Sequence, residues 1–285
     1  MIEAVIAAKA KDLGGFEVGR VIPQIARRSV GPFVFFDHFG PAHFEPGFPR
    51  AADVRPHPHI GLSTVTYLFE GEITHRDSVG SEVAIQPGEM NWMTAGRGIT
   101  HSERFETLRA VGGAMHGIQA WVALPEADEE TQPAFAHHDP ADLPTYESGG
   151  LWARLIAGEA FGVRAAVKVH SPMFYVHWRL AARARAQVEA DYSERAAFVA
   201  QGAVELDGQR FEAGQMLILG PGKPLFTAIT DAQIMLLGGE PLGPRYLDWN
   251  FVSSSRERIE QAKADWRAGR MKLPDADHDE FIPLP

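Results

Sequence analysis

The chain contains no cysteine among its 285 residues. Disulfide cross-links, thiolate metal ligands and thiol nucleophiles are therefore excluded, and any metal site must be built from His, Asp and Glu. The sequence also lacks an uninterrupted apolar run of the roughly 20 residues that a membrane-spanning helix requires. Its N-terminal part has no continuous apolar segment of the signal-peptide type. We therefore expect a cytoplasmic protein that does not associate with membranes.

Positive charge is in the minority. There are 27 Lys and Arg residues against 37 Asp and Glu residues, which gives a formal net charge of −10. Because phosphate backbones and anionic lipid surfaces repel an acidic protein, nucleic acid is not expected as a direct partner. A hydrophobic content of 45% and a charged content of 22% are those of a soluble globular protein. A chain of this length exceeds the usual size of one core, so two domains are expected.

Helical patterns are scarce as well. Most apolar segments are short, rich in β-branched and aromatic residues, and separated by Gly and Pro, which predicts an all-β protein. The clearest predicted strands are Val18–Ile25, Phe33–Phe36, Leu62–Phe69, Ile73–Asp77, Val83–Ile85, Met90–Thr94, Ile99–Glu103, Gly117–Leu124, Leu151–Ile156, Val163–Val169, Met173–Leu180, Ala196–Val199, Met216–Leu219 and Gln233–Leu237.

One helix and one domain connection are predicted. The helix spans about residues 254–268, where Ser254 and Glu257 have the spacing of a capping box. The acidic, proline-rich segment 125–150 has the composition of a connection between domains. The predicted domains are therefore residues 1–130 and 131–285, the second including the helix, and the polar tail from Lys272 is expected on the surface.

Two short motifs place four potential metal ligands on strands. His57 and His59 are separated by one residue, and so are His101 and Glu103. Side chains at positions i and i+2 of a strand point to the same face, so each pair can reach a single point. If the two strand ends lie side by side, three imidazoles and one carboxylate converge in a metal site. The alternative is a pair of ordinary surface strands that carry histidines.

The other histidines are expected to be structural or solvated. We interpret His38 as the polar end of a core strand, His75 as a surface residue, His116 as a packed or hydrogen-bonded histidine, and His137 and His138 as solvated loop residues.

The second half of the chain resembles a duplicate of the first. Aligning the glycine turns around Gly71 and Gly202, and then those around Gly88 and Gly214, superimposes the flanking strands. In this alignment Val188 and Ala190 stand opposite His57 and His59, and Thr227 and Ile229 stand opposite His101 and Glu103. All four potential ligands are thus replaced in the second copy. The surface-strand alternative is weakened, because a shared scaffold would not itself require histidines.

These motifs resemble the two motifs of the cupin superfamily and, more specifically, the pirin family of bicupins. The matching stretches are Phe36–Pro41, Pro56–Gly61, Thr66–Tyr67, Gly98–Glu103, His116–Val122 and Gly238–Leu242, spread over the chain in the family's order. Common cupin enzymes carry a glutamate a few residues after the His-x-His pair, where Ser63 lies here, and a later histidine. Taking the carboxylate from Glu103 instead agrees with the pirin pattern.

The resemblance implies two antiparallel β-barrels of the cupin type (a double-stranded β-helix, jelly-roll-like) with a short C-terminal helix. It also implies one divalent metal ion held by residues matching His57, His59, His101 and Glu103, most often Fe(II). The same ligands could take Zn, Ni, Co, Mn or Cu. Three His and one Glu leave up to two octahedral positions for substrate or dioxygen, and the sequence does not select the metal.

Two functions are compatible with this resemblance. The favoured one is a dioxygenase of the quercetin 2,3-dioxygenase type that acts on flavonols or similar planar enols, with dioxygen as co-substrate and Glu103 as the catalytic base. The alternative is a metal-dependent redox-sensing regulatory protein that binds a protein partner. We expect a monomer, and the physiological substrate stays open.

Overall fold

A computed structural model describes residues 2–12 and 16–285 of the chain. Within these residues the contacts define two compact units, each assembled from segments that are distant in sequence. One unit comprises residues 1–10, 19–38 and 140–241; the other comprises residues 11–18, 39–139 and 242–285. Each unit takes in a terminal segment from the opposite half of the chain. Because each unit mixes segments from both halves of the chain, the predicted boundary between the two cupin-type domains near residue 130 stays a prediction.

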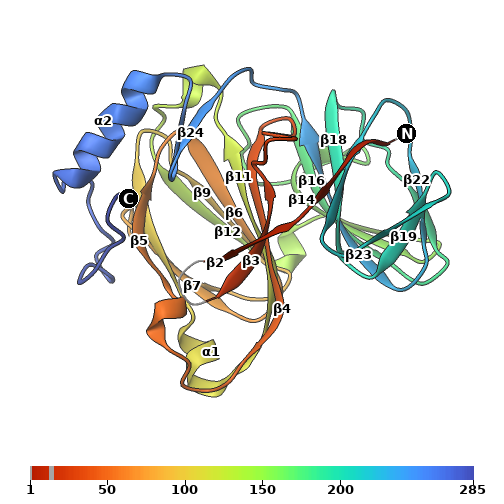
Figure 1. The fold of residues 1–285 in the computed structure, drawn as a ribbon, viewed down its shortest axis with the longest axis horizontal. Coiled ribbons are helices and arrows are strands. Elements are labelled where there is room, and N and C mark those ends of the chain that lie inside the picture. The colour runs from red at the N-terminus through yellow and green to blue at the C-terminus, as the bar shows by residue number, and fades with distance from the viewer. Residues whose placement is uncertain (1, 13–15) are drawn as a thin grey trace. The chain divides into compact units, whose positions relative to one another are not determined.

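The unit that contains residues 39–139 is built on two antiparallel sheets (Figure 1). The larger sheet has the strand order β12-β9-β6-β11-β4-β3-β2, and the smaller one has the order β5-β10-β7-β8. Their bounds are β2 (Lys9–Asp12), β3 (Glu17–Ile22), β4 (Phe33–Phe44), β5 (Val54–His59), β6 (Leu62–Glu70), β7 (Ile73–Asp77), β8 (Glu82–Ile85), β9 (Met90–Thr94), β10 (Ile99–Arg104), β11 (Gly113–Ala123) and β12 (Ala134–His138).

The other unit repeats this plan. Its larger sheet has the order β1-β21-β18-β23-β16-β14-β13, with β15 paired to β14, and its smaller sheet has the order β17-β22-β19-β20. The bounds are β1 (Ile2–Ala7), β13 (Thr145–Ser148), β14 (Leu151–Ala160), β15 (Val163–Arg164), β16 (Met173–Leu180), β17 (Arg185–Gln187), β18 (Glu194–Gln201), β19 (Ala203–Leu206), β20 (Gln209–Glu212), β21 (Gln215–Leu219), β22 (Leu225–Ala228) and β23 (Ala232–Gly239). The predicted all-β class with two cupin-type domains is confirmed.

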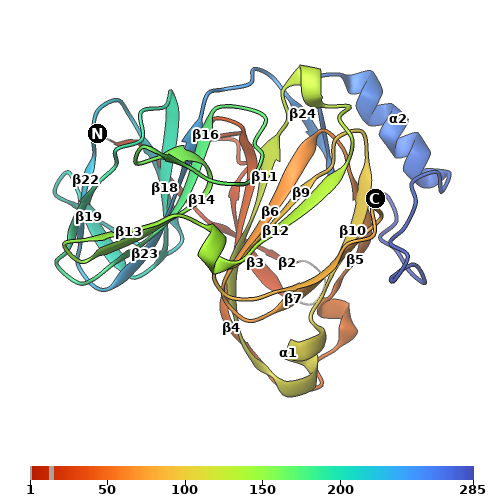
Figure 2. The ribbon, with the colours of Figure 1, turned by 180° about the vertical axis from the view of Figure 1, so that it is seen from behind.

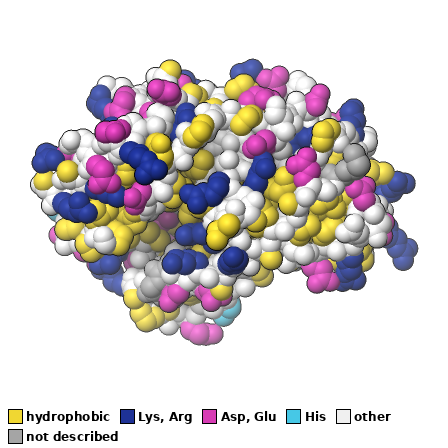
Figure 3. Space-filling model, turned by 45° about the horizontal axis from the view of Figure 1, so that its top comes forward, with side chains coloured by type: hydrophobic (Ala, Val, Ile, Leu, Met, Phe, Trp, Pro, Cys, Tyr) yellow, Lys and Arg dark blue, Asp and Glu magenta, His cyan; other side chains and the backbone are white. Residues whose placement is uncertain are grey.

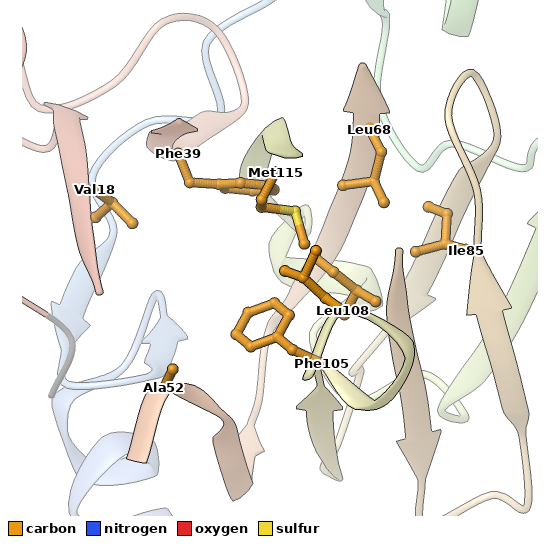
Figure 4. Close-up of a cluster of buried hydrophobic side chains, with 9 residues drawn as sticks. Val18, Phe39, Ala52, Leu68, Ile85, Phe105, Leu108 and Met115 are labelled. Carbon is orange, nitrogen blue, oxygen red and sulfur yellow. The ribbon is translucent and has the colours of Figure 1, made fainter. Parts of the chain in front are cut away.

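The unit that contains residues 39–139 is called the first barrel below, and the unit that contains residues 140–241 is called the second barrel. Apolar side chains close one end of the first barrel. Phe105, Leu108 and Met115 point toward one another in a buried cluster that also contains Phe39 and Leu68 (Figure 4). Leu108 comes from a short helix, α1 (Glu106–Val111), which directly follows β10 and which the sequence did not predict. Burial of such side chains contributes about 1.5–3 kcal/mol each. The end of β10 is therefore anchored immediately after Glu103.

The predicted C-terminal helix is confirmed as α2 (Arg256–Arg267). Its N-cap is Ser255 rather than the predicted Ser254: the Ser255 hydroxyl accepts the N–H of Arg258 at 3.2 Å. The buried face of α2 carries Ile259, Ala262 and Trp266, which pack with Ile60 and Phe251. The period of about 3.6 residues places these three helix residues on one side. Phe251 belongs to a two-stranded sheet of β24 (Tyr246–Asp248) and β25 (Phe251–Ser253).

The polar tail is tied to the strands of the smaller sheet in the first barrel. The backbone N–H of Ile282 donates to the carbonyl of Pro56 at 2.8 Å, and Trp266 Nε1 donates to the carbonyl of Ile282 at 3.0 Å. The C-terminus accordingly lies beside β5 in both views (Figures 1 and 2). The tail is therefore more than the simple surface segment that its composition predicted.

The segment predicted as a domain connection takes part in both larger sheets. Residues 125–150 contain β12, which pairs with β9, and β13, which pairs with β14.

Among the described residues no helix has the length and apolar character to cross a membrane. On the face seen in Figure 3, acidic and basic side chains are interspersed.

Candidate metal centre

The two histidine motifs lie on neighbouring antiparallel strands. β5 pairs with β10 so that His57 stands directly opposite His101, and His59 stands opposite Ile99. The register shifts between His101 and Glu103, where two residues of β5 face one of β10. Such a bulge bends the strand and re-aims side chains. The strands predicted to lie side by side are thus adjacent.

Three imidazoles meet on the inner face of this sheet. The ring centroids of His57 and His101 are 4.4 Å apart, and those of His59 and His101 are 5.1 Å apart. All three residues are buried, with relative exposures of 6% for His57, 1% for His59 and 1% for His101. One ring nitrogen from each lies within 4.8 Å of the other two. This spacing suits three ligands of one metal ion.

Main-chain carbonyl groups orient two of the three rings. Nδ1 of His57 lies 2.8 Å from the carbonyl oxygen of Arg55, and Nδ1 of His59 lies 3.0 Å from that of Asn250. Because a carbonyl oxygen only accepts, each Nδ1 must carry its proton. Each neutral ring then has a lone pair on Nε2. The rings are therefore held in the tautomer that binds a metal through Nε2.

The Nε2 atoms of His59 and His101 face each other in an arrangement that suits a bound cation. Nε2 of His59 and Nε2 of His101 are 3.2 Å apart. With Nδ1 protonated on both rings, two lone pairs would face one another across this gap, and a metal ion between them would bind both. A donor set of three neutral imidazoles suits Fe, Zn, Cu, Ni and Co.

Burial keeps these histidines neutral. Desolvation lowers the pKa of His57 to about 4, against a raising contribution from its hydrogen bond to Arg55. The pKa values of His59 and His101 are lowered well below the ordinary value, first by burial and then by the nearby imidazoles. A neutral imidazole is the form that binds metal. The site is thus ready for a cation without first losing a proton near neutral pH.

Glu103 is buried beside these histidines. Its carboxylate oxygens are not among the ligand atoms of His57, His59 and His101 that lie within 4.8 Å of one another. Its Oε1 accepts a hydrogen bond from Gln119 Nε2 at 2.7 Å and lies 3.4 Å from the Thr66 hydroxyl. Thr66 also donates to Oε1 of Gln119 at 2.8 Å. Burial raises the pKa of Glu103 above its ordinary value, although His75 and these hydrogen bonds oppose the shift. Its role as a fourth ligand stays a prediction.

A glycine allows the C-terminal segment to approach His59. Gly61 has φ +68°, and a Cβ at this position would lie 2.0 Å from the carbonyl oxygen of Val252. Ile60 forms a parallel bridge with Phe251, one residue after the carbonyl of Asn250 that orients His59. Only glycine combines this backbone conformation with such a close contact.

His75 and its partner Asp77 were not recognised from the sequence. His75, expected at the surface, is buried on β7, which pairs with β10 on the side away from β5. Its Nε2 lies 2.9 Å from Asp77 Oδ2, its Nδ1 lies 3.4 Å from His101 Nδ1, and its ring stacks on Phe135. Histidine and aspartate at i and i+2 on a predicted strand carried the same spacing signal as the two motifs.

His116 and His137 have other partners than the three converging imidazoles. His116 is buried against Phe69, which confirms the prediction of a packed histidine. His137, expected in a solvated loop, lies half-buried on β12, with Nδ1 2.8 Å from Asn91 Oδ1. Its Nε2 is 3.6 Å from carboxylates of Glu89 and Asp139. His137 thus lies against an amide and two carboxylates at a partly exposed position.

The second barrel is filled with apolar side chains at the corresponding strands. Phe226 and Ala228 of β22 are buried, whereas Ile229 is exposed. The inner positions are therefore Phe226 and Ala228, and the predicted alignment of Thr227 and Ile229 was displaced by one residue. A slip of one residue exchanges the two faces of a strand. Phe226 packs edge-on to Trp178. Neither the predicted nor the observed inner residues of this segment include a His, Asp or Glu that could bind a metal.

The fold and this site define a two-domain cupin-type protein with a buried histidine cluster in its first barrel, suited to a metal ion. Residues 15–122 match the profile of the family described as Pirin, and residues 175–272 match that of the Pirin C-terminal cupin domain. The chain belongs to the pirin family.

Relatives and solved structures agree with this assignment. A pirin-like protein of Caulobacter vibrioides is 66% identical over 287 residues, which cover 100% of both chains. The crystal structure of a quercetin 2,3-dioxygenase from Acinetobacter baumannii is similar, with a TM-score of 0.91 and 30% identity over 99% of this chain and 94% of that one. A bacterial pirin from Escherichia coli in complex with nickel(II) shares the fold, with a TM-score of 0.66 and 20% identity over 85% and 100% of the chains.

Proposed function

We propose that this protein is a metal-dependent dioxygenase of the quercetin 2,3-dioxygenase type, acting on flavonols or similar planar enols. The observation that carries the proposal is the convergence of three buried, neutral imidazoles beside a buried carboxylate with a raised pKa. The name of the Acinetobacter baumannii relative supports the reaction type. The nickel(II) complex of the Escherichia coli pirin supports metal binding on this fold.

His57, His59 and His101 would hold the ion through Nε2, with Glu103 as a fourth ligand after its side chain turns from Gln119. A bound divalent ion, iron by preference, would supply Lewis acidity toward the substrate oxygen and redox capacity toward dioxygen. We take Fe(II) as the physiological ion, with Zn, Ni, Co, Mn or Cu as ions that the same ligands accept.

Glu103 would act as the general base that removes the hydroxyl proton of the enol. Its carboxylate would receive the proton, and a pKa raised by burial brings it closer to the operating pH. When the carboxylate is not bound to the ion, the amide of Gln119 would hold Oε1 of Glu103 through the hydrogen bond seen in the structure. Buried aromatic walls such as Trp121, edge-on to His59 at 5.0 Å, limit water around the site.

Anaerobic reconstitution with each divalent metal, followed by oxygen and by spectroscopic measurement of quercetin loss, tests this proposal. The wild type should turn over with at least one ion, and His101→Ala should be inactive. Glu103→Gln should bind the metal and lose about 100-fold or more in turnover, as for removal of a general base. His116→Gln serves as the control. Absence of turnover with every ion, with wild type and His101→Ala indistinguishable, would refute it.

A second candidate function is a metal-dependent redox sensor that binds a protein. The observation favouring it is the direct connection between the site and the surface tail, since Ser102, between His101 and Glu103, donates a hydrogen bond to Asp277 at 2.6 Å. Pull-downs with oxidised and reduced holoprotein would distinguish the two functions. Identical partners in both states would count against the sensor.

A further inference from the structure

His75 has a different relation to the cluster from the three histidines that converge. Its Nδ1 lies 3.4 Å from Nδ1 of His101, whereas Nε2 of His101 is the atom that faces His59. The two nitrogens lie on opposite sides of an imidazole ring. His75 therefore contacts His101 from behind, and the His101 ring separates it from the point where a metal would bind. It is placed as a partner of a ligand and not as a ligand.

Asp77 is fixed more firmly than a surface carboxylate. It is 1% exposed, and its Oδ1 accepts the backbone N–H groups of Val79 and Ser81, both at 3.0 Å. Its Oδ2 is thereby directed to Nε2 of His75 at 2.9 Å. The ring of His75 stacks on Phe135 at a centroid distance of 4.5 Å and an interplanar angle of 16°. Neither residue has freedom to turn away from His101.

The hydrogen-bond roles along this chain are determined by elimination. The carboxylate of Asp77 can only accept, so the proton of a singly protonated imidazole at position 75 is on Nε2. Nδ1 of His75 is then an acceptor, and the atom facing it, Nδ1 of His101, must donate. His101 consequently has its lone pair on Nε2. His57 and His59 reach the same tautomer through the carbonyl groups of Arg55 and Asn250.

We propose that Asp77 and His75 are positioning residues that hold His101 in its metal-binding tautomer through the chain Asp77–His75–His101. They replace, for this one ligand, the main-chain carbonyl that serves each of the other two. The hydrogen bond from His101 to a carboxylate-paired imidazole also makes Nε2 of His101 a stronger electron-pair donor to a metal ion. This inference rests on the metal site of the proposed function, but it concerns metal binding and not the reaction.

Asp77→Asn is a nearly isosteric test. The amide oxygen of Asn can keep the two N–H contacts of the turn, while its NH₂ group faces Nε2 of His75. His75 must then accept at Nε2 and carry its proton on Nδ1, which opposes a proton on Nδ1 of His101. His75→Gln removes this dependence, because a Gln amide can present its oxygen to His101 whatever residue occupies position 77.

The experiment is a double-variant cycle measured by Co(II) affinity in competition with a chelator. Asp77→Asn should bind Co(II) about 10- to 100-fold more weakly than wild type. Adding Asp77→Asn to His75→Gln should cost little further, so the two changes should be non-additive. Hyperfine-shifted proton NMR of the Co(II) protein should show three exchangeable Nδ1–H signals in wild type, with the His101 signal displaced in Asp77→Asn. His116→Gln, another buried histidine change, should leave affinity and signals as in wild type.

Two results would overturn the inference: wild-type affinity with three unchanged signals in Asp77→Asn, or strictly additive losses in the cycle, which indicate a merely structural role. Failure of the proposed function has a different signature, because tight Co(II) binding without turnover of any flavonol would refute the reaction and leave this inference standing. A wild-type protein that bound no metal would refute both.

Discussion

Arg104 donates two parallel hydrogen bonds to Asp277, from Nε to Oδ2 at 2.7 Å and from Nη2 to Oδ1 at 2.8 Å. The guanidinium is buried, and Glu280 and Asp53 lie within 3.0 and 3.4 Å of it. Burial alone would raise the pKa of Asp277, but the hydrogen bonds from Arg104 and Ser102 outweigh it and hold the pKa below its ordinary value. The residue after Glu103 is thus clamped by the C-terminal tail.

Asp277→Ala should therefore destabilise the protein. It removes two charge-assisted hydrogen bonds to a buried guanidinium that keeps Asp53 and Glu280 beside it, so the loss should be about 1.5–3 kcal/mol. Chemical denaturation gives the free energy of unfolding directly. Asp275→Ala is the matched control on the same tail, because the Asp275–Lys272 pair is exposed and such pairs contribute about 0–1 kcal/mol. Equal effects of the two substitutions would contradict the prediction.

Metal binding should stabilise the first barrel. The three histidines link β5 to β10, and an ion that binds only the folded state adds about 2.7 kcal/mol when its free concentration is 100-fold above Kd. Chelator should consequently lower the melting temperature of the holoprotein by several degrees. His101→Ala should melt at the same temperature with and without chelator. A holoprotein melt unaffected by chelator would argue against this coupling.

Stability of the metal-free protein should rise with pH between about 4 and 6.5. Burial lowers the pKa of His57 and of His116 to about 4, so in this range the unfolded chain binds protons that the folded chain does not. Stability is therefore lost as the pH falls from the unfolded pKa toward the folded one, by about 3 kcal/mol for each group at the lower limit. Denaturation of apoprotein at a series of pH values measures the slope, and His116→Gln should reduce it.

Phe226→Ala should lower the free energy of unfolding strongly, whereas Thr227→Ala should change it little. Phe226 fills the second barrel against Trp178, and Phe→Ala at buried positions costs about 3–5 kcal/mol. Thr227 is half-buried on the opposite face of β22 and should change stability by about 0.5 kcal/mol or less. Metal affinity should be unchanged in both variants. A larger stability loss for Thr227→Ala than for Phe226→Ala would support the alignment predicted from the sequence, in which Thr227 is the inner residue.

Local periodicity predicted much of the site and little of its support. The i, i+2 rule brought His57, His59 and His101 to one face, and the pairing of β5 with β10 confirmed it. The partners that orient the rings are main-chain carbonyls, which every residue has, so no residue type marks Arg55 or Asn250 in the sequence.

Long-range pairing explains the remaining differences. The tail was expected on the surface because its composition is polar, but no pattern in the sequence indicated that Asp277 would pair with the buried Arg104, which lies far away along the chain. The N-cap and the alignment of β22 were each displaced by one residue, which periodicity does not resolve when neighbouring residues are of similar type. The family and the all-β class were predicted because they depend on patterns repeated over many residues.

The carbonyl of Asn250 gives the chain an order of assembly. His57, His59 and His101 all belong to the first half of the sequence, but the group that fixes the ring of His59 lies beyond the whole second barrel. A nascent chain that has emerged from the ribosome only as far as residue 240 would carry all three histidines and still lack one of their orienting partners. Completion of the metal centre thus waits for synthesis of the chain through residue 250, after the strands of both barrels.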